Sequence, residues 1–212
     1  MNKHVTCPSS QPAHIAVALT GASGAIYGLT LIQQLLNSGC RVSFLVSSAG
    51  RQVMALEQGL EWSSDLALFQ QQARDYFNDE KQNLVCYGEQ DFTAPLASGS
   101  SAADAMVVVP SSMGTVARIA TGISGNLIER VADVMLKERR TLVVVPRETP
   151  FNTIHLQNLL TLSQTGAIIL PAMPAFYSQP QSMDELINFV VGKILDSLDL
   201  PHDLYTRWGE KE

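Results

Sequence analysis

A short loop of small residues separates an apolar run from a helical pattern near the start of the chain. The run is "HIAVALT" (14–20), the loop is "GASG" (21–24), and "AIYGLTLIQQLL" (25–36) follows. Glycines let a ligand approach the backbone, and free N–H groups at a helix start attract phosphate. The spacing is G-x-x-G-x-x-x-G, and Ser47 rather than an acid follows the second strand, so the pattern of an NAD site is missing. These residues leave two interpretations open, a phosphate-bearing ligand or a tight structural turn.

Hydroxyl groups gather again after the apolar run "AMVVVP" (105–110). Ser111, Ser112, Gly114 and Thr115 surround the start of a predicted helix. Hydroxyl and backbone N–H groups at such a position can donate to a phosphate or to the edge of a planar ring, or they can simply cap the helix.

Two charged residues, Arg147 and Glu148, follow the buried-strand pattern "TLVVVP" (141–146). A charge is costly to desolvate unless it is paired. A salt bridge between the two is one explanation, but adjacent residues on a strand point in opposite directions. The pattern therefore favours a functional site.

Arg130 and Lys137 lie seven residues apart on a predicted helix, 126–138, so they share a face. This face is either a cationic wall suited to an anionic substrate or a solvated surface paired with Glu129 and Asp133.

The segment "PAMPAFYSQPQS" (171–182) is rich in proline and carries Phe176 and Tyr177. A rigid aromatic loop of this kind is either a lid over an apolar ligand or an ordered connector.

His155, early in a predicted helix, is interpreted as structural. The chain shows neither the logic of a catalytic triad nor metal-ligand spacing, so we predict no metal.

The elements that must position these residues alternate between strand and helix. Strands are predicted at 14–20, 41–47, 105–110, 141–146 and 167–171, with helices at 25–39, 48–59, 62–77, 115–121, 126–138, 153–165 and 182–198. Continuously apolar strands that alternate with helices indicate a parallel sheet covered on both faces. We predict one doubly wound α/β domain, residues 14–212, after a disordered arm, residues 1–13. In such a sheet, ligands bind beyond the carboxyl ends of the strands.

Composition sets limits on function. The chain has 212 residues, 46% of them hydrophobic, and a net charge of −6, which argues against a nucleic-acid surface. The three cysteines are scattered, as expected in a reducing compartment. The N-terminus lacks a signal-peptide core, and no apolar run reaches the ~20 residues of a membrane helix. We expect a cytoplasmic protein without a membrane span.

Four long motifs, taken in order, resemble those of the flavin prenyltransferases, the UbiX-like enzymes once described as aromatic-acid decarboxylases. They are "TGASGAIYG", "SGNLIERVADVMLKERR", "LVVVPRETPFNTIHLQNLLTL" and "GAIILPAMPAFYSQPQS". The resemblance runs from about residue 14 to Trp208 and implies a Rossmann-like, flavodoxin-like fold that binds FMN. It implies metal-independent transfer of a dimethylallyl group from dimethylallyl phosphate to N5 and C6 of reduced FMN. Members form dodecamers with sites at subunit interfaces, and prenylated FMN serves a UbiD-like decarboxylase, often in ubiquinone synthesis.

The resemblance also assigns roles to residues of this chain. The positions that match FMN contacts are Gly21, Ala22, Ser23, Ser47, Ser112, Met113, Gly114, Thr115 and Arg147. The positions that match the substrate phosphate and prenyl site are Arg130, Lys137, Tyr177, Lys193 and Trp208. Ser23, Glu57 and Glu148 match polar residues near the reacting flavin and are the catalytic candidates.

Three rival interpretations stay open at this point. A phosphopantothenoylcysteine-type flavin decarboxylase shares the fold, but such enzymes use an active-site histidine, and no histidine lies between His14 and His155. A non-catalytic FMN carrier would not need Lys137, Tyr177 and Lys193 together. A direct aromatic-acid decarboxylase lacks any evident residue set for that step.

Overall fold

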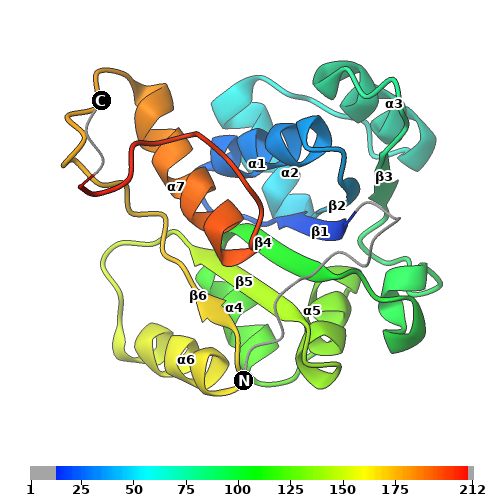
Figure 1. The fold of residues 1–212 in the computed structure, drawn as a ribbon. Helices are drawn as coiled ribbons and strands as arrows, with labels where there is room; N and C mark the ends of the chain where they lie inside the picture. The colour runs from blue at the N-terminus through cyan, green and yellow to red at the C-terminus, as the bar shows by residue number, and fades with distance from the viewer. Residues whose placement is uncertain (1–12, 210–212) are drawn as a thin grey trace.

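The computed structural model describes residues 13–209, which form a single parallel sheet with helices on both faces (Figure 1). The predicted disordered arm lies outside the described residues, except for Ala13, which is buried. The six strands are β1 (His14–Leu19), β2 (Arg41–Val46), β3 (Leu84–Tyr87), β4 (Ala105–Ser111), β5 (Thr141–Pro146) and β6 (Ile168–Ile169). The predicted doubly wound α/β class is confirmed.

The strands lie in the order β3-β2-β1-β4-β5-β6, and all neighbouring pairs are parallel. This is the classic order of doubly wound nucleotide-binding sheets, in which the chain changes direction between β1 and β4. The connections leave these two neighbours toward opposite sides, so a crevice is expected beyond their carboxyl ends.

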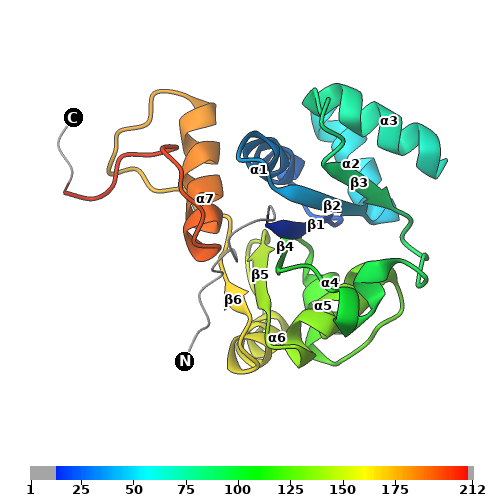
Figure 2. The ribbon, with the colours of Figure 1, turned by 45° about the vertical axis from the view of Figure 1, so that its right-hand side comes forward.

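The α-helices divide between the two faces of the sheet, as Figure 2 shows most clearly. Their bounds are α1 (Ala25–Asn37), α2 (Ser48–Gln58), α3 (Leu66–Phe77), α4 (Met113–Ala120), α5 (Leu127–Lys137), α6 (Thr153–Gln164) and α7 (Met183–Ser197). One hydrophobic cluster joins the sheet to α1, α2, α3 and α7, and a second joins it to α4, α5 and α6. Along β1, Ile15 and Val17 enter the first cluster, whereas Ala16 and Ala18 enter the second, as the alternation of a strand requires.

Side-chain caps explain where most of the helices begin. Six of the seven α-helices in residues 13–209 have a capping residue whose side chain accepts a backbone N–H: Ser47, Asp65, Ser112, Asn126, Asn152 and Ser182. His155 completes a capping box with Asn152, which agrees with its interpretation as structural. The exception is α1, whose first residue follows Gly24 without a local cap.

Most differences from the predicted elements lie between residues 60 and 104. The helix expected over 62–77 begins only at Leu66, because Asp65 caps it. The edge strand β3 was missed, since it has only four residues and its buried and exposed side chains alternate over too short a run to give a pattern. Residues 94–104, for which no element was predicted, contain two short 3₁₀ turns, Pro95–Ala97 and Gly99–Ser101.

The last helix and the segment after it form a separate corner of the molecule. In Figure 2, α7 and the chain on either side of it stand at one end of the sheet. Gly192 makes this packing possible, because a Cβ atom there would lie 2.6 Å from the ring of Tyr205 and 2.9 Å from His202. The segment 199–209 therefore folds directly back onto α7.

Candidate active site

Thr20 joins the ends of β1 and β4, the two strands between which the chain changes direction. Its hydroxyl donates to the carbonyl of Pro110 at 2.9 Å, and it accepts the N–H of Ser112 at 2.8 Å. The residue is buried. These bonds fix the first loop and the start of α4 relative to each other, so the two predicted FMN segments share one edge of the sheet.

Glu57, in the last turn of α2, caps the start of α1 from a distance. Its carboxylate accepts the N–H of Gly24 at 2.9 Å and the N–H of Ala25 at 3.0 Å, and it bonds the hydroxyl of Ser23. The helix-start N–H groups that we interpreted as a possible phosphate cradle are thus partly taken by a carboxylate of the chain itself. Sequence patterns around the loop do not reveal this, because the cap comes from 33 residues away.

The environment of Glu57 favours its ionised form. Burial alone would raise the pKa of this carboxyl group, but the bonds from Ser23, Gly24 and Ala25, with the charge of Arg147 nearby, hold the pKa below its usual value. The group therefore stays charged at neutral pH and is a weaker proton acceptor than an ordinary glutamate.

The first loop rests directly on the start of α2. A Cβ atom at Gly21 would lie 2.6 Å from the Cβ atom of Ala49, so only glycine allows this approach. Ser47 caps α2 by accepting the N–H of Gly50 at 3.0 Å. Ser47 and the loop 21–24, which we predicted to bind the same ligand, consequently lie side by side.

The segment after β4 presents hydroxyl groups at the start of α4. Ser112 accepts the N–H of Thr115 at 3.3 Å, and its hydroxyl lies 3.1 Å from that of Thr115. Met113 is buried, whereas Gly114 is exposed. Ser111 is fully buried, and its hydroxyl has no partner among the described residues.

Arg147 and Glu148 make separate contacts instead of pairing with each other. Arg147 donates from Nε to the carbonyl of Ser23 at 3.0 Å, which joins the end of β5 to the first loop. Glu148 is exposed and accepts the N–H of Thr149 at 3.1 Å. The alternative of an Arg147–Glu148 salt bridge is not realised, and both residues lie at the same edge of the sheet as the two loops.

The residues at this edge fit a flavin mononucleotide. The phosphate and the ring edge of such a group need several donors, and this edge supplies the hydroxyls of Ser23, Ser47 and Ser112 and the guanidinium of Arg147. The buried hydroxyl of Ser111, at the end of β4, has no partner among residues 13–209, and a buried polar atom of that kind calls for an explanation such as a ligand.

Tyr177 and Trp208 lie in the corner formed by α7 and the segment after it. Their rings meet edge to face with centroids 5.0 Å apart, and the Tyr177 hydroxyl donates to the carbonyl of Thr206 at 3.3 Å. Trp208 is 80% exposed and Phe176 is 68% exposed. Large aromatic side chains with this much open surface are suited to an interface or to a ligand.

Asp196 organises the charges of the same corner. Its carboxylate accepts bonds from Lys193 at 3.2 Å, from Arg207 at 2.9 Å and from the Tyr205 hydroxyl at 2.5 Å, and it contacts His202 at 3.1 Å. Burial alone would raise the pKa of Asp196, but these four partners hold it well below its usual value. Burial alone would likewise lower the pKa of Lys193, yet its bond to Asp196 leaves that pKa raised. Lys193 is therefore a fixed cation.

Arg130 and Lys137 lie apart from both groups. Arg130 donates to the carbonyl of Ala97 at 3.0 Å and pairs with Asp133 at 2.9 Å. Lys137, the last residue of α5, pairs with Glu138. Since α5 runs back toward the amino ends of the strands, Lys137 lies at the opposite edge of the sheet from the loops (Figure 1).

The solvated-face interpretation of this helix holds only in part. Arg130 and Lys137 have neighbouring acids, but Glu129 is buried and pairs with Arg118 on α4 instead. Among residues 13–209, no hydrogen bond or ion pair connects Arg130, Lys137 or Lys193 to the first loop or to the start of α4.

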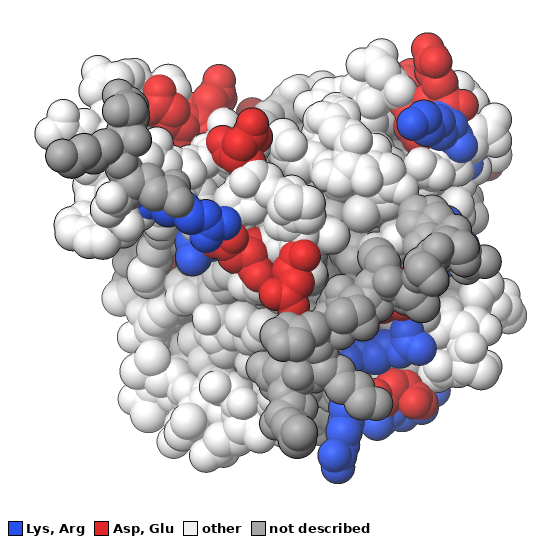
Figure 3. Space-filling view, viewed as in Figure 1, with Lys and Arg blue, Asp and Glu red and all other residues white. Residues whose placement is uncertain are grey.

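The charge distribution agrees with small anionic ligands rather than a polyanion. In the view of Figure 3, Lys and Arg atoms lie in separate places, beside α7, near α3 and toward the side where α5 lies, with acids next to each group. In the part of the chain that the structure describes, no group of histidine, cysteine and acidic residues could hold a metal ion. No helix there is long and apolar enough to cross a membrane. Cys86 is buried, and burial raises the pKa of its thiol to about 12.

Sequence reasoning missed Thr20, and it missed the roles of two residues that it had named, Glu57 and Glu129. Thr20 and the Glu57 cap act through contacts that are distant in sequence, so no local pattern points to them. Glu129 did leave a signal, because Asn126 followed three residues later by Glu129 is a capping-box spacing. Its pairing with Arg118 requires the packing of α4 against α5.

Comparisons with known proteins agree with this arrangement. The model of the Flavoprotein family matches residues 6–195. The chain is 50% identical to the flavin prenyltransferase UbiX of Pseudomonas aeruginosa over 202 residues, which cover 95% of this chain and 97% of that protein.

Two solved structures share the fold over nearly their whole length. The crystal structure of AnUbiX (PadA1) in complex with FMN and dimethylallyl pyrophosphate has a TM-score of 0.85 and 38% identity, and covers 95% of this chain and 100% of that chain. A dodecameric FMN-dependent UbiX-like decarboxylase from Escherichia coli O157:H7 has a TM-score of 0.82 and 35% identity, and covers 93% and 100%. With matches of this extent and an edge built from the residues of the motifs, the chain belongs to the flavin prenyltransferase family of flavoproteins.

Proposed function

We propose that this chain transfers a dimethylallyl group from dimethylallyl phosphate to N5 and C6 of reduced FMN. The observation that carries the proposal is the meeting of the first loop, the start of α4 and Arg147 at one edge of the sheet, in a chain 50% identical to a flavin prenyltransferase. Bound FMN supplies the electron-rich ring that accepts the prenyl group.

The chain holds FMN through the segments around the crevice between β1 and β4. The backbone of Gly21, Ala22 and Ser23 lies close to Ser47, and Ser112, Met113, Gly114 and Thr115 form the second contact. Arg147, fixed on the Ser23 carbonyl, provides the positive charge of this half. We call this set of residues the cofactor half of the site.

A second copy of the chain supplies the residues that bind the phosphate of the donor. Arg130, Lys137, Tyr177, Lys193 and Trp208, which we call the donor half, do not reach the cofactor half within one chain. The aromatic rings of Phe176 and Trp208 are exposed, so a neighbouring subunit could pack against them. We therefore propose a homo-oligomer, with a dodecamer as the expected form, whose active sites lie between subunits.

The two halves serve the two charges that develop during transfer. Breaking the carbon–oxygen bond leaves negative charge on phosphate, which Lys193 and the other cations stabilise from fixed positions. The allyl group carries the positive charge, and the faces of Tyr177 and Trp208 stabilise it while they exclude water.

A proton must leave C6 of the flavin, and Glu148 is the best-placed acceptor. It is exposed at the cofactor edge, and within residues 13–209 its carboxylate accepts a hydrogen bond only from the N–H of Thr149. Glu57, by contrast, is occupied as a helix cap with a depressed pKa. We assign Glu57 and Ser23 to holding the first loop and Glu148 to moving the proton.

Prenylated FMN is a cofactor for another enzyme, so the product must leave the site. We propose a UbiD-like decarboxylase in the cytoplasm as the recipient, with ubiquinone synthesis as the expected pathway. Support comes from the resemblance of the motifs.

Mass spectrometry of the flavin tests the proposed reaction. Protein, reduced FMN and dimethylallyl phosphate are incubated without oxygen, the flavin is released and its mass is measured, with dimethylallyl pyrophosphate in a parallel sample. A gain of one C5 unit is expected with the monophosphate. Bound but unmodified FMN in both samples would contradict the proposal and favour a carrier or a cysteine-peptide decarboxylase.

A further inference from the structure

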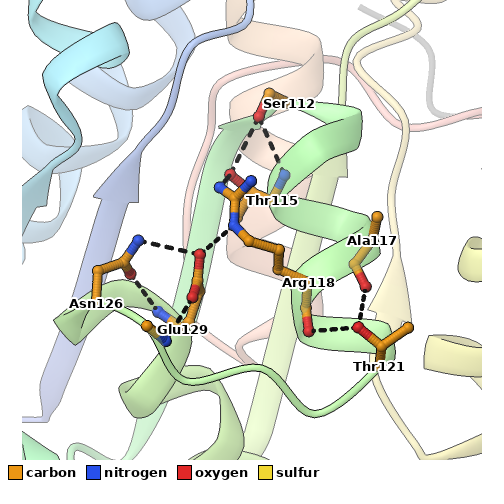
Figure 4. Close-up of polar contacts among 8 residues, drawn as sticks. Ser112, Thr115, Ala117, Arg118, Thr121, Asn126 and Glu129 are labelled. Atoms are coloured by element: carbon orange, nitrogen blue, oxygen red, sulfur yellow. Dashed lines mark hydrogen bonds and ion pairs between the residues drawn. The ribbon is translucent and has the colours of Figure 1, made fainter.

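Glu129 begins a chain of polar contacts that ends at the cofactor half of the site (Figure 4). The residue lies on α5, is 1% exposed and pairs with Arg118 of α4. Its carboxylate also accepts the N–H of Gly125 at 2.8 Å and the side-chain amide of Asn126 at 3.0 Å. A buried charge is tolerated only when it is paired and hydrogen-bonded in this way.

Arg118 links Glu129 to the first turn of α4. Its Nη2 atom lies 3.5 Å from the hydroxyl of Thr115, while Nε bonds Glu129. A Cβ atom at Gly114 would lie 3.4 Å from Nη1, so the guanidinium group lies directly against this turn. Figure 4 shows Arg118 between Glu129 on one side and Thr115 with Ser112 on the other.

The chemistry of these groups favours one direction for each hydrogen bond. An arginine only donates, so the oxygen of Thr115 accepts from Arg118, and this contact favours the arrangement in which the Thr115 hydroxyl donates to Ser112, 3.1 Å away. The Ser112 oxygen then receives two donors, the Thr115 hydroxyl and the Thr115 N–H at 3.3 Å. The proton of Ser112 is left to donate to a group outside this chain of contacts.

We propose that Glu129 and Arg118 are positioning residues that fix the Ser112 hydroxyl as a donor to an acceptor oxygen of the bound flavin. The inference rests on the proposed function, in which Ser112 contacts FMN. The acceptor is either a phosphate oxygen or an oxygen of the ring system, since both accept hydrogen bonds and neither donates one. A rotating Ser112 hydroxyl, by contrast, would spend part of its time presenting a lone pair to that oxygen.

Flavin affinity measured on the intact protein tests this arrangement. Dissociation constants for FMN and riboflavin are obtained from the quenching of flavin fluorescence for the wild type, Ser112→Ala, Arg118→Met and the double variant. Each single substitution is expected to weaken FMN binding about fivefold, the effect of one hydrogen bond. In the Ser112→Ala background, Arg118→Met should add less than about twofold, because both act through the same donor.

Riboflavin identifies the acceptor. If the Ser112 donor reaches the phosphate, the two substitutions leave riboflavin binding unchanged, and if it reaches the ring, they weaken riboflavin and FMN equally. Arg118→Lys should restore part of the affinity, since it can still donate to Thr115. Arg140→Met is the matched control, because it removes an arginine paired with Asp104 at the opposite edge of the sheet and should leave flavin affinity intact.

Several outcomes would overturn the inference. If Arg118→Met lowered FMN affinity equally in the wild-type and Ser112→Ala backgrounds, Arg118 would act by supporting the fold and not by positioning Ser112. An FMN affinity that is unchanged in Ser112→Ala would show that the Ser112 hydroxyl does not donate to the flavin. Thr115→Val interrupts the same contacts without disturbing the buried charge, so it keeps the test valid if Arg118→Met lowers stability. Each of these results leaves the prenyl-transfer assay above intact, so the two proposals fail separately.

Discussion

The cofactor half and the donor half of the proposed site differ in how completely one chain builds them. In the cofactor half, Thr20, Glu57 and Arg147 tie together loops from β1, α2, β4 and β5. In the donor half, Lys193 and Tyr177 contact only α7 and its flanking segments, and Lys137 lies at the other edge of the sheet.

The difference has a physical origin. The carboxyl ends of parallel strands necessarily meet at one edge, so the topology alone gathers the cofactor half. The donor half is spread over α5, α7 and the segments that flank α7, and the proposal is that a second copy brings those residues to the flavin. A chain that buries its catalytic pocket between copies keeps water away from the allyl group without a large mobile lid.

Mixing two inactive variants tests the comparison most directly. We expect Arg147→Met to disable the cofactor half and Lys193→Met to disable the donor half. Mixed oligomers should regain activity in about a quarter of their sites, because a site that draws on two copies is intact when each contributes its unaltered half. Mixing Arg147→Met with Ser112→Ala, both in the cofactor half, is the control and should give no more than the average of the two separate activities. No recovery in oligomers that native mass spectrometry shows to be mixed would place both halves in one chain.

Glu148→Gln separates proton transfer from binding. The side chain keeps its shape but loses its ability to accept a proton, so kcat is expected to fall about 100-fold while the FMN dissociation constant stays the same. Single-turnover kinetics with a flavin titration gives both values. Glu80→Gln, on the exposed surface far from the site, serves as the control. Unaltered turnover would remove Glu148 from the mechanism.

Lys193→Ala probes the donor half alone. Loss of one charged contact to phosphate is expected to raise the KM for dimethylallyl phosphate about tenfold, with little change in FMN affinity. Lys193→Arg should stay within a few fold of the wild type because the charge is kept. If FMN affinity changed and the KM did not, Lys193 would belong to the cofactor half.

Glu57→Gln gives the smallest expected effect and depends on pH. Because the folded-state pKa of Glu57 lies below its ordinary value, its contribution to stability is present above about pH 4.5 and is lost as the pH falls through the lower, folded value. Thermal unfolding at pH 7 should therefore show the variant lower in Tm by about 2 °C, as expected for a partly exposed cap. The difference in Tm between the variant and the wild type should disappear at acidic pH. A difference in Tm that does not depend on pH would mean that the charge of Glu57 does not hold the first loop.

Local patterns were sufficient for most of the fold. Apolar runs of five to seven residues predicted five of the six strands in the described part of the chain, and the helices predicted at 48–59 and 153–165 begin at the predicted residues. The edge strand β3 was missed because an element of four residues has too little periodicity to be read. The candidate residues of the cofactor half came from the resemblance to the family, and the structure brings Ser23, Ser112 and Arg147 to one edge.

The sequence by itself determined the family, the parallel sheet and the candidate residues for the flavin site, because these follow from motifs and from the alternation of apolar runs. Only the tertiary structure decided that Glu57 caps α1, that Thr20 joins β1 to β4, and that buried Glu129 reaches Ser112 through Arg118. Such contacts join residues that are distant in the chain, and their energies depend on burial and on exact distances. A sequence pattern contains neither burial nor interatomic distances, so the arrangement of the site is decided only when the helices pack on the sheet.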